Sequence, residues 1–303
     1  MSFRPTTKGH LTPGTGSAVT RFAARADAAA FVRQIWIPEW DLPVGEQTEQ
    51  FVLGYPASNV VVEPDGVAIY GPTSRASTRV LVGSGWAVGA LLKPAGVRLF
   101  AERPAELLDV DAPIAAAGLH RSICEVMGSS GAAEHSGTAE SGPADSWLAG
   151  SGPAASEDAA SAAAYRARAA DLLQDYIQSL AAERSDGGMS DDAALANQMV
   201  DLIDEGDIRS APQLARALHL SERSVQRLAS RYVGMSAVLM LRRRRLQDAA
   251  ERVRAEPATD LGELAAELGF SDQAHLTREF RQVLGFTPRQ YPAPPAAQRE
   301  KQG

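Results

Sequence analysis

The spacing of apolar positions changes twice along the 303-residue chain. From about residue 28 to residue 128, short apolar runs such as "NVVVE" and "WAVGALL" alternate with turn residues. The turn signals are Pro-Asp-Gly at 64–66 and Gly-Ser-Gly at 83–85, because glycine tolerates a positive φ. Short strands at this spacing predict an antiparallel β-sandwich or half-barrel over residues 26–127. The following "AERPAELLDVD" predicts a short helix.

The pattern becomes helical from residue 164. Leu172, Leu173, Tyr176 and Leu180 recur at spacings of three and four, which places them on one helix face. The next stretch, "DDAALANQMVDLIDEG", begins with capping carboxylates and ends at Gly206. Residues 164–206 therefore predict an amphipathic helical segment. Its packing partner is left open: its own two helices, the next module, or a second copy of the chain.

Three stretches have no such period. Residues 1–25 are rich in Gly, Thr and Pro, which predicts a flexible arm, and residues 292–303 predict a flexible tail. Residues 128–163 consist almost entirely of Gly, Ser, Ala, Pro and acidic residues, with Trp147-Leu148 as an apolar island. Such a composition buries too little apolar surface to offset the entropy of ordering, so we expect a disordered acidic linker.

One segment of the C-terminal third occurs twice. Leu214 and Leu218 match Leu264 and Leu268 at an offset of fifty residues. After a one-residue insertion the offset is fifty-one, and the matching pairs are Val225 with Leu276, Arg227 with Arg278, Val233 with Leu284, Gly234 with Gly285 and Ser236 with Thr287. An internal duplication explains these matches better than chance does.

Each copy has the pattern of two helices joined by a tight turn. Ser210 is a suitable N-cap for the first helix, with Pro212 in its first turn. Ser221 caps the second helix, and Asp272 takes that place in the second copy. His219 stands where the second copy has Gly269, so we expect a positive φ at this turn position. Residues 207–291 therefore predict a double helix-turn-helix, in which the second helix of each unit enters a DNA major groove.

The second helix of each unit has an apolar face and a polar leading end. The expected inward residues are Val225, Leu228 and Tyr232 in the first copy and Leu276, Phe280, Val283 and Leu284 in the second. The expected base-contacting residues are Arg223, Gln226 and Arg227, then Gln273, Ala274, His275 and Arg278. Arginine pairs with guanine O6 and N7, and glutamine pairs with adenine N6 and N7. For a single helix a solvated face is the simpler interpretation, but two tandem copies favour DNA recognition.

A continuous helix is predicted between the copies, because 236–256 contain neither Gly nor Pro and are rich in helix formers. About twenty residues at ~1.5 Å rise span ~30 Å, and successive major grooves on one DNA face lie ~34 Å apart. This helix carries four consecutive arginines, which point in different directions around its axis. We assign Ser221, Thr277, Arg242 and Arg245 to the DNA backbone. For any one arginine, pairing with a carboxylate such as Asp248 and full solvation are the alternatives.

The charge is unevenly distributed. The net charge of −7 and the pI of about 5.4 argue against a nucleic-acid partner. Residues 128–207, however, carry a net charge of −12, and residues 208–291 carry +5. The C-terminal module is therefore basic, although the net charge of the whole chain is negative.

The second copy, "TDLGELAAELGFSDQAHLTREFRQVLGFTPRQY", resembles the signature of the AraC/XylS transcription regulators, and "RLQDAAERV" is similar to their connecting helix. The first copy departs from that pattern at Ala229, where a phenylalanine is common. By this resemblance the base-contacting positions are those that the helix geometry selects. "IWIPEWDLP" and "GWAVGALLKPAGVRLF" are similar to the small, cupin-like β-rich sensor domain that precedes such modules. The resemblance implies double-stranded DNA at a promoter or operator, RNA polymerase and a small-molecule effector as partners, and a cytoplasmic, nucleoid-associated protein.

The sequence gives little support for an enzyme. The single cysteine, Cys124, allows neither an intramolecular disulfide nor a thiol metal cluster. The five histidines are scattered, and residues 28–118 contain none, so a metal-binding cupin is not expected. We expect no metal, no cofactor, no membrane span and no secretion signal. The alternatives left open are a β domain that serves dimerisation, giving a homodimer, or other protein contacts without a ligand, and, less favoured, an enzyme fused to a DNA-binding module.

Overall fold

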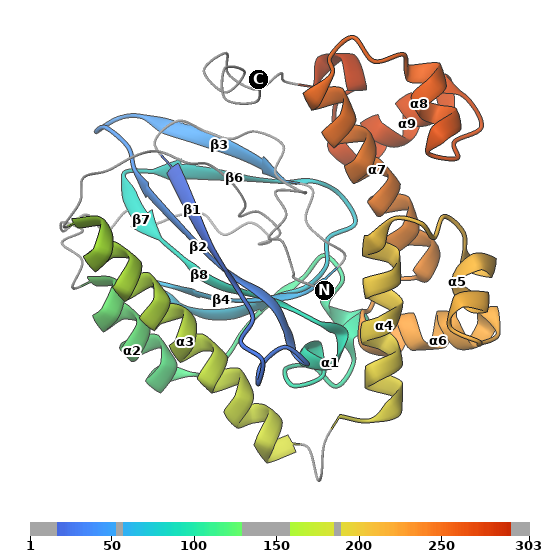
Figure 1. Cartoon of the computed structure of the whole chain (residues 1–303). Coiled ribbons are helices and arrows are strands. Elements are labelled where there is room, and N and C mark those ends of the chain that lie inside the picture. Colours follow the sequence, from blue (N-terminus) through green and yellow to red (C-terminus); the bar gives the residue numbers. More distant parts are fainter. Residues whose placement is uncertain (1–16, 53–56, 129–157, 185–188, 292–303) are drawn as a thin grey trace.

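The structure is a computed structural model that describes residues 17–52, 57–128, 158–184 and 189–291. The predicted tail at 292–303, Trp147-Leu148 and most of the predicted arm and linker lie outside these residues. An antiparallel β domain is followed by an all-helical module, as predicted (Figure 1). Within the described part of the chain, no helix is long and apolar enough to cross a membrane.

The β domain is built on one main sheet and a smaller ribbon. The strands of the main sheet are β1 (Ser17–Ala23), β2 (Val32–Asp41), β4 (Asn59–Glu63), β5 (Gly66–Tyr70), β7 (Ser84–Trp86), β8 (Val88–Leu92) and β9 (Asp111–Pro113). They lie in the order β1-β2-β8-β4-β5-β9, with β7 also paired to β2, and every pair is antiparallel. Strands β3 (Gln47–Val52) and β6 (Ser77–Val82) form the ribbon.

The prediction of a flexible arm over residues 1–25 is wrong at its C-terminal end. Residues 17–23 form β1, which pairs with β2 from Ser17 opposite Trp40 to Ala23 opposite Gln34. β1 lies at the edge of the sheet and its side chains are half-buried or exposed, so it lacks the apolar alternation that marks a strand in a sequence. Its conformation follows from the long neighbour that it pairs with.

Both faces of the main sheet are covered. Helices α2 (Ala117–Gly128) and α3 (Asp158–Arg184) lie side by side on one face, where Ile123 and Leu173 share a core with Ile35 and Val60 (Figure 1). Strands β4 and β8 are buried on both faces, so their sequences are continuous apolar runs without alternation. The predicted second β layer is reduced to the β3–β6 ribbon, and helices cover the other face.

The face beneath the ribbon packs around aromatic rings. Leu81 of β6 joins Trp36 and Val61 in a second cluster. Gly89 stands opposite Trp36 in the β2–β8 register, and a Cβ there would lie 2.1 Å from a ring carbon of Trp36. Glycine is therefore required at this position for the indole to lie flat on the sheet.

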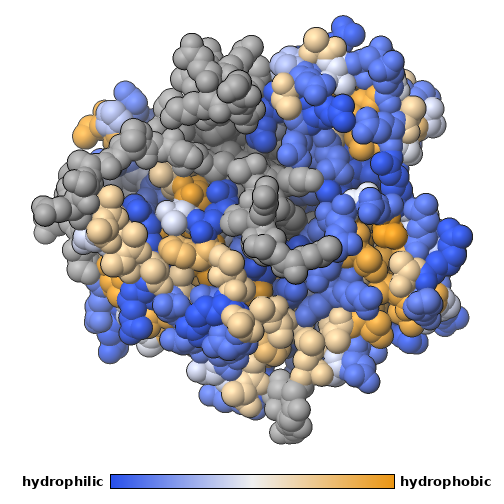
Figure 2. Space-filling model, in the orientation of Figure 1, coloured by the Kyte–Doolittle hydropathy of each residue, from blue (hydrophilic) through white to orange (hydrophobic). Residues whose placement is uncertain are grey.

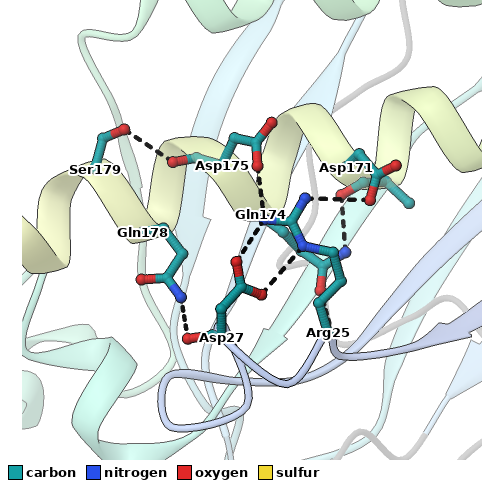
Figure 3. A network of polar contacts seen from close by, with 8 residues as sticks. Arg25, Asp27, Asp171, Gln174, Asp175, Gln178 and Ser179 are labelled. Carbon is teal, nitrogen blue, oxygen red and sulfur yellow. Dashed lines mark hydrogen bonds and ion pairs between the residues drawn. The ribbon is translucent and has the colours of Figure 1, made fainter.

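Ion pairs also hold helix α3 on the β domain. Figure 3 shows Arg25, in the link between β1 and β2, reaching three carboxylates: Asp27 at 3.0 Å, Asp175 at 2.6 Å and Asp171 at 3.3 Å. The backbone N–H of Arg25 donates to Gln174 Oε1 at 2.8 Å. The ion pair with Arg25 lowers the pKa of Asp27. Acidic residues of α3 are thus engaged by the β domain.

The helical module contains two short helix pairs joined by a long helix. Its elements are α4 (Asp191–Glu205), α5 (Ala211–Ala217), α6 (Glu222–Tyr232), α7 (Ala237–Ala255), α8 (Leu261–Glu267), α9 (Gln273–Leu284) and the 3-10 helix η2 (Pro288–Gln290). The β domain contributes the short helices α1 (Pro94–Val97) and η1 (Pro104–Leu107). The predicted connecting helix is confirmed as α7, which Ser236 caps.

Two predicted boundaries need correction. Helix α3 begins at Asp158, so residues 158–163 of the predicted linker are helical, which is explained by the alanine-rich composition of "DAASAAA". The helix predicted for "AERPAELLDVD" is only the four-residue η1. The amphipathic segment at 164–206 is divided between the modules: α3 packs on the sheet, whereas α4 packs on α1, α6 and α7.

Candidate nucleic-acid interface

The two predicted helix-turn-helix units are present, one at each end of α7 (Figure 1). Helices α5 and α6 form the first unit, and α8 and α9 form the second. The expected positive φ at the turns is confirmed, with 55° at His219 and 74° at Gly269. α7 has 19 residues, which corresponds to ~28 Å of helix. This length is close to the ~34 Å between successive major grooves on one face of DNA.

Each recognition helix begins at a capping side chain. Ser221 Oγ accepts a hydrogen bond from the backbone N–H of Ser224 at 3.1 Å. In the second unit, Asp272 Oδ1 accepts from the backbone N–H of His275 at 2.6 Å. Ser210 caps α5 in the first unit, and Asp260 caps α8 in the second. These hydrogen bonds lower the pKa of both aspartates.

The apolar faces are buried as predicted. The buried residues are Val225, Leu228 and Tyr232 on α6 and Leu276, Phe280, Val283 and Leu284 on α9. Phe280 and its counterpart Ala229 are both fully buried. The smaller Ala229 lies in a core that also contains Met199 and Ile203 from α4. Helix α4 thus completes the first unit at the position where the sequence departs from the usual phenylalanine.

The polar leading ends face solvent. Arg223, Gln226 and Arg227 are exposed on α6, and Gln273, Ala274 and Arg278 are exposed on α9. Figure 2 shows that hydrophilic side chains make up most of the visible surface of α7 to α9. The structure therefore brings the base-contacting candidates to the surface at the N-terminal ends of both recognition helices.

His275 is the exception among these candidates, because it is half-buried and has partners in the protein. Its Nδ1 lies 3.0 Å from Ser271 Oγ and 3.3 Å from the Ser271 backbone nitrogen. Its ring packs edge-on against Phe270, with the ring centroids 5.5 Å apart. Nδ1 accepts from the backbone N–H of Ser271, so in the neutral ring Nε2 carries the proton, and it lies 4.0 Å from Glu279 Oε1.

The four consecutive arginines of α7, residues 242–245, have four different environments. Arg242 pairs with Glu279 and donates to Gln282 Oε1 at 2.9 Å. Arg245 donates to the carbonyl of Gly269 at 3.0 Å, and its guanidinium lies 4.9 Å from the Phe270 ring centroid. These two predicted backbone-contacting arginines hold α8 and α9 on α7. Contact with phosphate stays a prediction for them, as it does for Ser221 and the half-buried Thr277.

The other two arginines face the rest of the protein. Arg243 is fully buried and donates to Thr73 Oγ1 in the β domain at 3.2 Å. Arg244 donates to the carbonyl of Asp204 at 3.1 Å and pairs with Asp248, which was the expected carboxylate partner. Successive helix residues point about 100° apart, so one run of four arginines serves two interfaces.

Arg209 is not among the residues predicted from the sequence. It is exposed and directly precedes the cap of α5, in the loop that follows α4, and Arg244 contacts the last turn of α4 at Asp204. The pKa of Arg245 is lowered by burial and by the positive charges of Arg242 and Arg209. The charges of Arg209 and Arg242 therefore act on Arg245, which lies beside the turn between α8 and α9. The sequence signal that could have identified Arg209 is a basic residue immediately before a helix cap.

Comparison with known proteins agrees with this architecture. Residues 214–293 match the family model described as "Helix-turn-helix domain", and residues 20–112 match a domain of unknown function (DUF6597). The chain is 39% identical over 71 residues to the F1 operon positive regulatory protein of Yersinia pestis. That match spans 23% of this chain and 23% of the regulator, so it covers less than a quarter of each.

Solved structures resemble the chain only distantly. The apo form of a ToxT variant from Vibrio cholerae is 8% identical, with a TM-score of 0.39 over 85% of this chain and 96% of that chain. ToxT from Vibrio cholerae with a bound unsaturated fatty acid is 9% identical, with a TM-score of 0.35 over 92% and 95%. The AraC-like transcriptional activator CuxR is 11% identical, with a TM-score of 0.22 over 77% and 87%. Because these identities and TM-scores are low, the function is inferred from the residues of the chain itself.

Proposed function

We propose that the chain is a member of the AraC/XylS family and that it regulates transcription by binding a specific DNA sequence with α6 and α9 in successive major grooves. One observation carries this proposal. Two recognition helices at the two ends of α7 expose arginine and glutamine at their leading ends, while their apolar faces are buried. The family is one of regulators, and we assign the chain no enzymatic reaction.

Each exposed side chain has a defined partner on DNA. Arg223 and Arg227 of α6 and Arg278 of α9 are suited to guanine, and Gln226 and Gln273 to adenine. Ala274 contacts a thymine methyl group, and His275 donates from Nε2 to a base acceptor. The base-contacting set is that of the sequence prediction, and Ser221, Thr277, Arg242 and Arg245 remain the backbone-contacting set.

Footprinting tests this function directly. The purified full chain is incubated with DNA from upstream of its own operon and cleaved with a small, sequence-neutral reagent. We expect a protected stretch of ~20 base pairs with two contact centres one helical turn apart. Absence of protection on every upstream fragment, in protein that is folded by circular dichroism, would exclude sequence-specific binding.

We propose that the β domain modulates this binding by taking up a small effector. The support is a group of buried polar and aromatic side chains between the main sheet and the ribbon. Trp36 Nε1 donates to Asn59 Oδ1 at 3.0 Å, and Tyr70 donates to Glu63 at 3.0 Å. The chemistry of these side chains matches a ligand that combines an apolar body with a few polar groups. A thermal-shift screen with aromatic and amphipathic compounds tests this, because a true ligand raises Tm.

A second role for the β domain is supported by a different observation. Val80 and Val82 of β6 are exposed on the outer side of the ribbon, at 41% and 56%. Exposed apolar side chains at a two-stranded ribbon suit pairing with a second copy of the chain. Sedimentation at several concentrations separates the two roles: a concentration-dependent dimer supports this one, and a stabilising ligand supports the first.

The remaining inferences concern the cellular context. The Yersinia relative is named as a positive regulator, and we infer activation, with RNA polymerase as partner and the nucleoid as location. Transcription in vitro from the footprinted promoter tests the sense of regulation. An increase in transcript supports activation, and a decrease indicates repression.

A further inference from the structure

The segment between β5 and β6, residues 71–76, joins the β domain to α9 of the second helix-turn-helix unit and to α7, the helix that carries that unit. The backbone N–H of Ala76 donates to the carbonyl of Val283, in the last turn of α9, at 2.7 Å. Thr73 Oγ1 accepts from Arg243 Nη1 of α7 at 3.2 Å, with Arg243 fully buried. The side chain of Ala76 also packs on the core of the second unit. We call residues 71–76 the bracing segment.

The bracing segment is itself held firmly. The Gly71 N–H donates to the carbonyl of Val110 at 3.0 Å, and the Asp109 N–H donates to the carbonyl of Pro72 at 3.0 Å. A Cβ on Gly71 would lie 1.7 Å from the carbonyl oxygen of Leu107, so the 107–110 loop is pressed against it. The Thr73 hydroxyl donates to the carbonyl of Arg75 at 2.8 Å, which orients its lone pairs toward Arg243.

Both ends of the bracing segment are tied to one buried carboxylate. Tyr70, immediately before it, donates to Glu63 Oε2 at 3.0 Å. Arg79, three residues after it, pairs with Glu63 Oε1. Glu63 lies at the end of β4, on the face of the main sheet beneath the ribbon. The position of the segment therefore depends on the interior of the β domain.

The first unit is held by different contacts. Asn197 of α4 accepts from the Ala95 N–H at 3.0 Å and donates to the carbonyl of Ala30 at 2.8 Å. Asp201 of α4 pairs with Arg33 at 2.6 Å. Helix α4 thus docks the first unit on the β domain, and the bracing segment docks the second. The β domain therefore holds the two recognition helices through two separate sets of contacts.

We propose that Thr73 and Ala76 are positioning residues that set the orientation of α9 relative to α6, and thereby the DNA spacing that the chain recognises. This inference rests on the proposed function. The contacts lie at α7 and at the C-terminal end of α9, whereas Gln273, Ala274 and Arg278 at its leading end stay exposed. The docked arrangement therefore leaves the leading end of α9 accessible to DNA. A recognition helix already held in place has less conformational freedom to lose when DNA binds.

The test uses Thr73→Val, which keeps the shape of the side chain and removes the acceptor, with Thr73→Ser as its matched control. We expect Thr73→Val to weaken binding to the full DNA site about fivefold, equivalent to about 1 kcal/mol. Protection should fade over the α9 half of the footprint and stay over the α6 half. Thr73→Ser should bind as the parent does. Unchanged or tighter binding by Thr73→Val would overturn the proposal.

A spacing series separates positioning from a general loss of stability. DNA sites are made with one or two base pairs inserted or removed between the two contact centres. The parent should lose most of its affinity at each altered spacing. Thr73→Val, which lacks the acceptor, and Ala76→Pro, which lacks the donor N–H, should discriminate less between spacings. Ala76→Gly, which retains the N–H, should discriminate as the parent does. Equal discrimination by all three variants and the parent would overturn the proposal even if Thr73→Val is less stable.

Glu63→Gln tests the link to the interior of the β domain. Removing the charge weakens the attachment of Arg79, so we expect the same selective loss over the α9 half, and an unaltered footprint would overturn this link. These outcomes are distinct from failure of the proposed function. If the parent protects no DNA, the function itself fails; if the parent protects both halves and every variant matches it, only the bracing role fails.

Discussion

At the scale of single residues, each recognition helix separates side chains that hold the fold from side chains that face solvent. Phe280 of α9 is fully buried and packs edge-on against Tyr291, with the ring centroids 5.8 Å apart. Arg278, two residues earlier, is exposed. Val225 and Arg227 divide α6 in the same way. Substitutions on the exposed side are therefore expected to change DNA binding and leave stability unchanged.

Arg227→Ala and Arg278→Ala should each weaken specific binding by about 1–3 kcal/mol and relax the preference for the contacted base. The reason is that each loses a bidentate contact to guanine. Gel-shift titrations with the footprinted site, and with single-base variants of it, measure both effects. Arg231→Ala is the matched control, because Arg231 is exposed at the far end of α6 and pairs with Asp192 at 3.0 Å. An equal loss in the control would argue against base contact.

At the scale of elements, the two helix-turn-helix units share a fold and differ in capping chemistry. Serines cap α5 and α6, whereas Asp260 and Asp272 cap α8 and α9. A hydroxyl keeps its acceptor at any pH, but a carboxyl group is the stronger acceptor only when ionised. Hydrogen bonds from backbone N–H groups lower the pKa of both aspartates. A carboxyl group with a depressed pKa stabilises the fold above its unfolded pKa, and this contribution is lost as pH falls through its folded pKa.

The second unit should therefore lose helical structure before the first when the pH falls below the ordinary carboxyl value of 3.8. Amide resonances of α8 and α9, compared with those of α5 and α6 in an acid titration, report this order. Combining Asp260→Asn with Asp272→Asn should abolish the difference, because asparagine caps a helix without titrating. If the order of loss persists in that variant, the caps are not its cause.

At the scale of the whole molecule, the net charge of −7 does not describe the face that we assign to DNA. Acidic residues of α3 and α4 are engaged by cations of the β domain, as Asp175 is by Arg25 (Figure 3) and Asp201 by Arg33. The charges of Arg209 and Arg242 act on Arg245, which lies on α7 beside the second unit. We propose that these guanidinium groups meet the DNA backbone where it crosses between two major grooves.

DNA binding should consequently fall steeply with salt, and Arg209→Ala should reduce the slope of log Kd against log salt concentration by about 1. The loss should be similar for specific and non-specific DNA, because a phosphate contact carries no sequence information. Fluorescence anisotropy at several salt concentrations measures the slope. Arg103→Ala, an exposed arginine of the β domain paired with Glu106 at 2.8 Å, is the control. An unchanged slope for Arg209→Ala would remove Arg209 from the phosphate-contacting set.

Local patterns determined the helix-turn-helix units. The duplication is visible as matching residues fifty and fifty-one positions apart. The positive φ at His219 and Gly269, the caps at Ser221 and Asp272, and the buried faces of α6 and α9 follow from residue spacing within each copy. The continuity of α7 follows from the lack of Gly and Pro. These features depend on backbone preferences and on which side of a helix is apolar, and both can be read along the chain.

Tertiary structure alone decided how these parts meet. β1 is a strand because β2 offers it a long partner, and α3 and α4 belong to different modules because each matches a different surface. The partners of the four arginines and the contact of Thr73 with Arg243, 170 residues away, depend on which loops the fold brings together. A sequence pattern shows which face of an element is to be buried, but the surface that covers it is chosen by long-range packing.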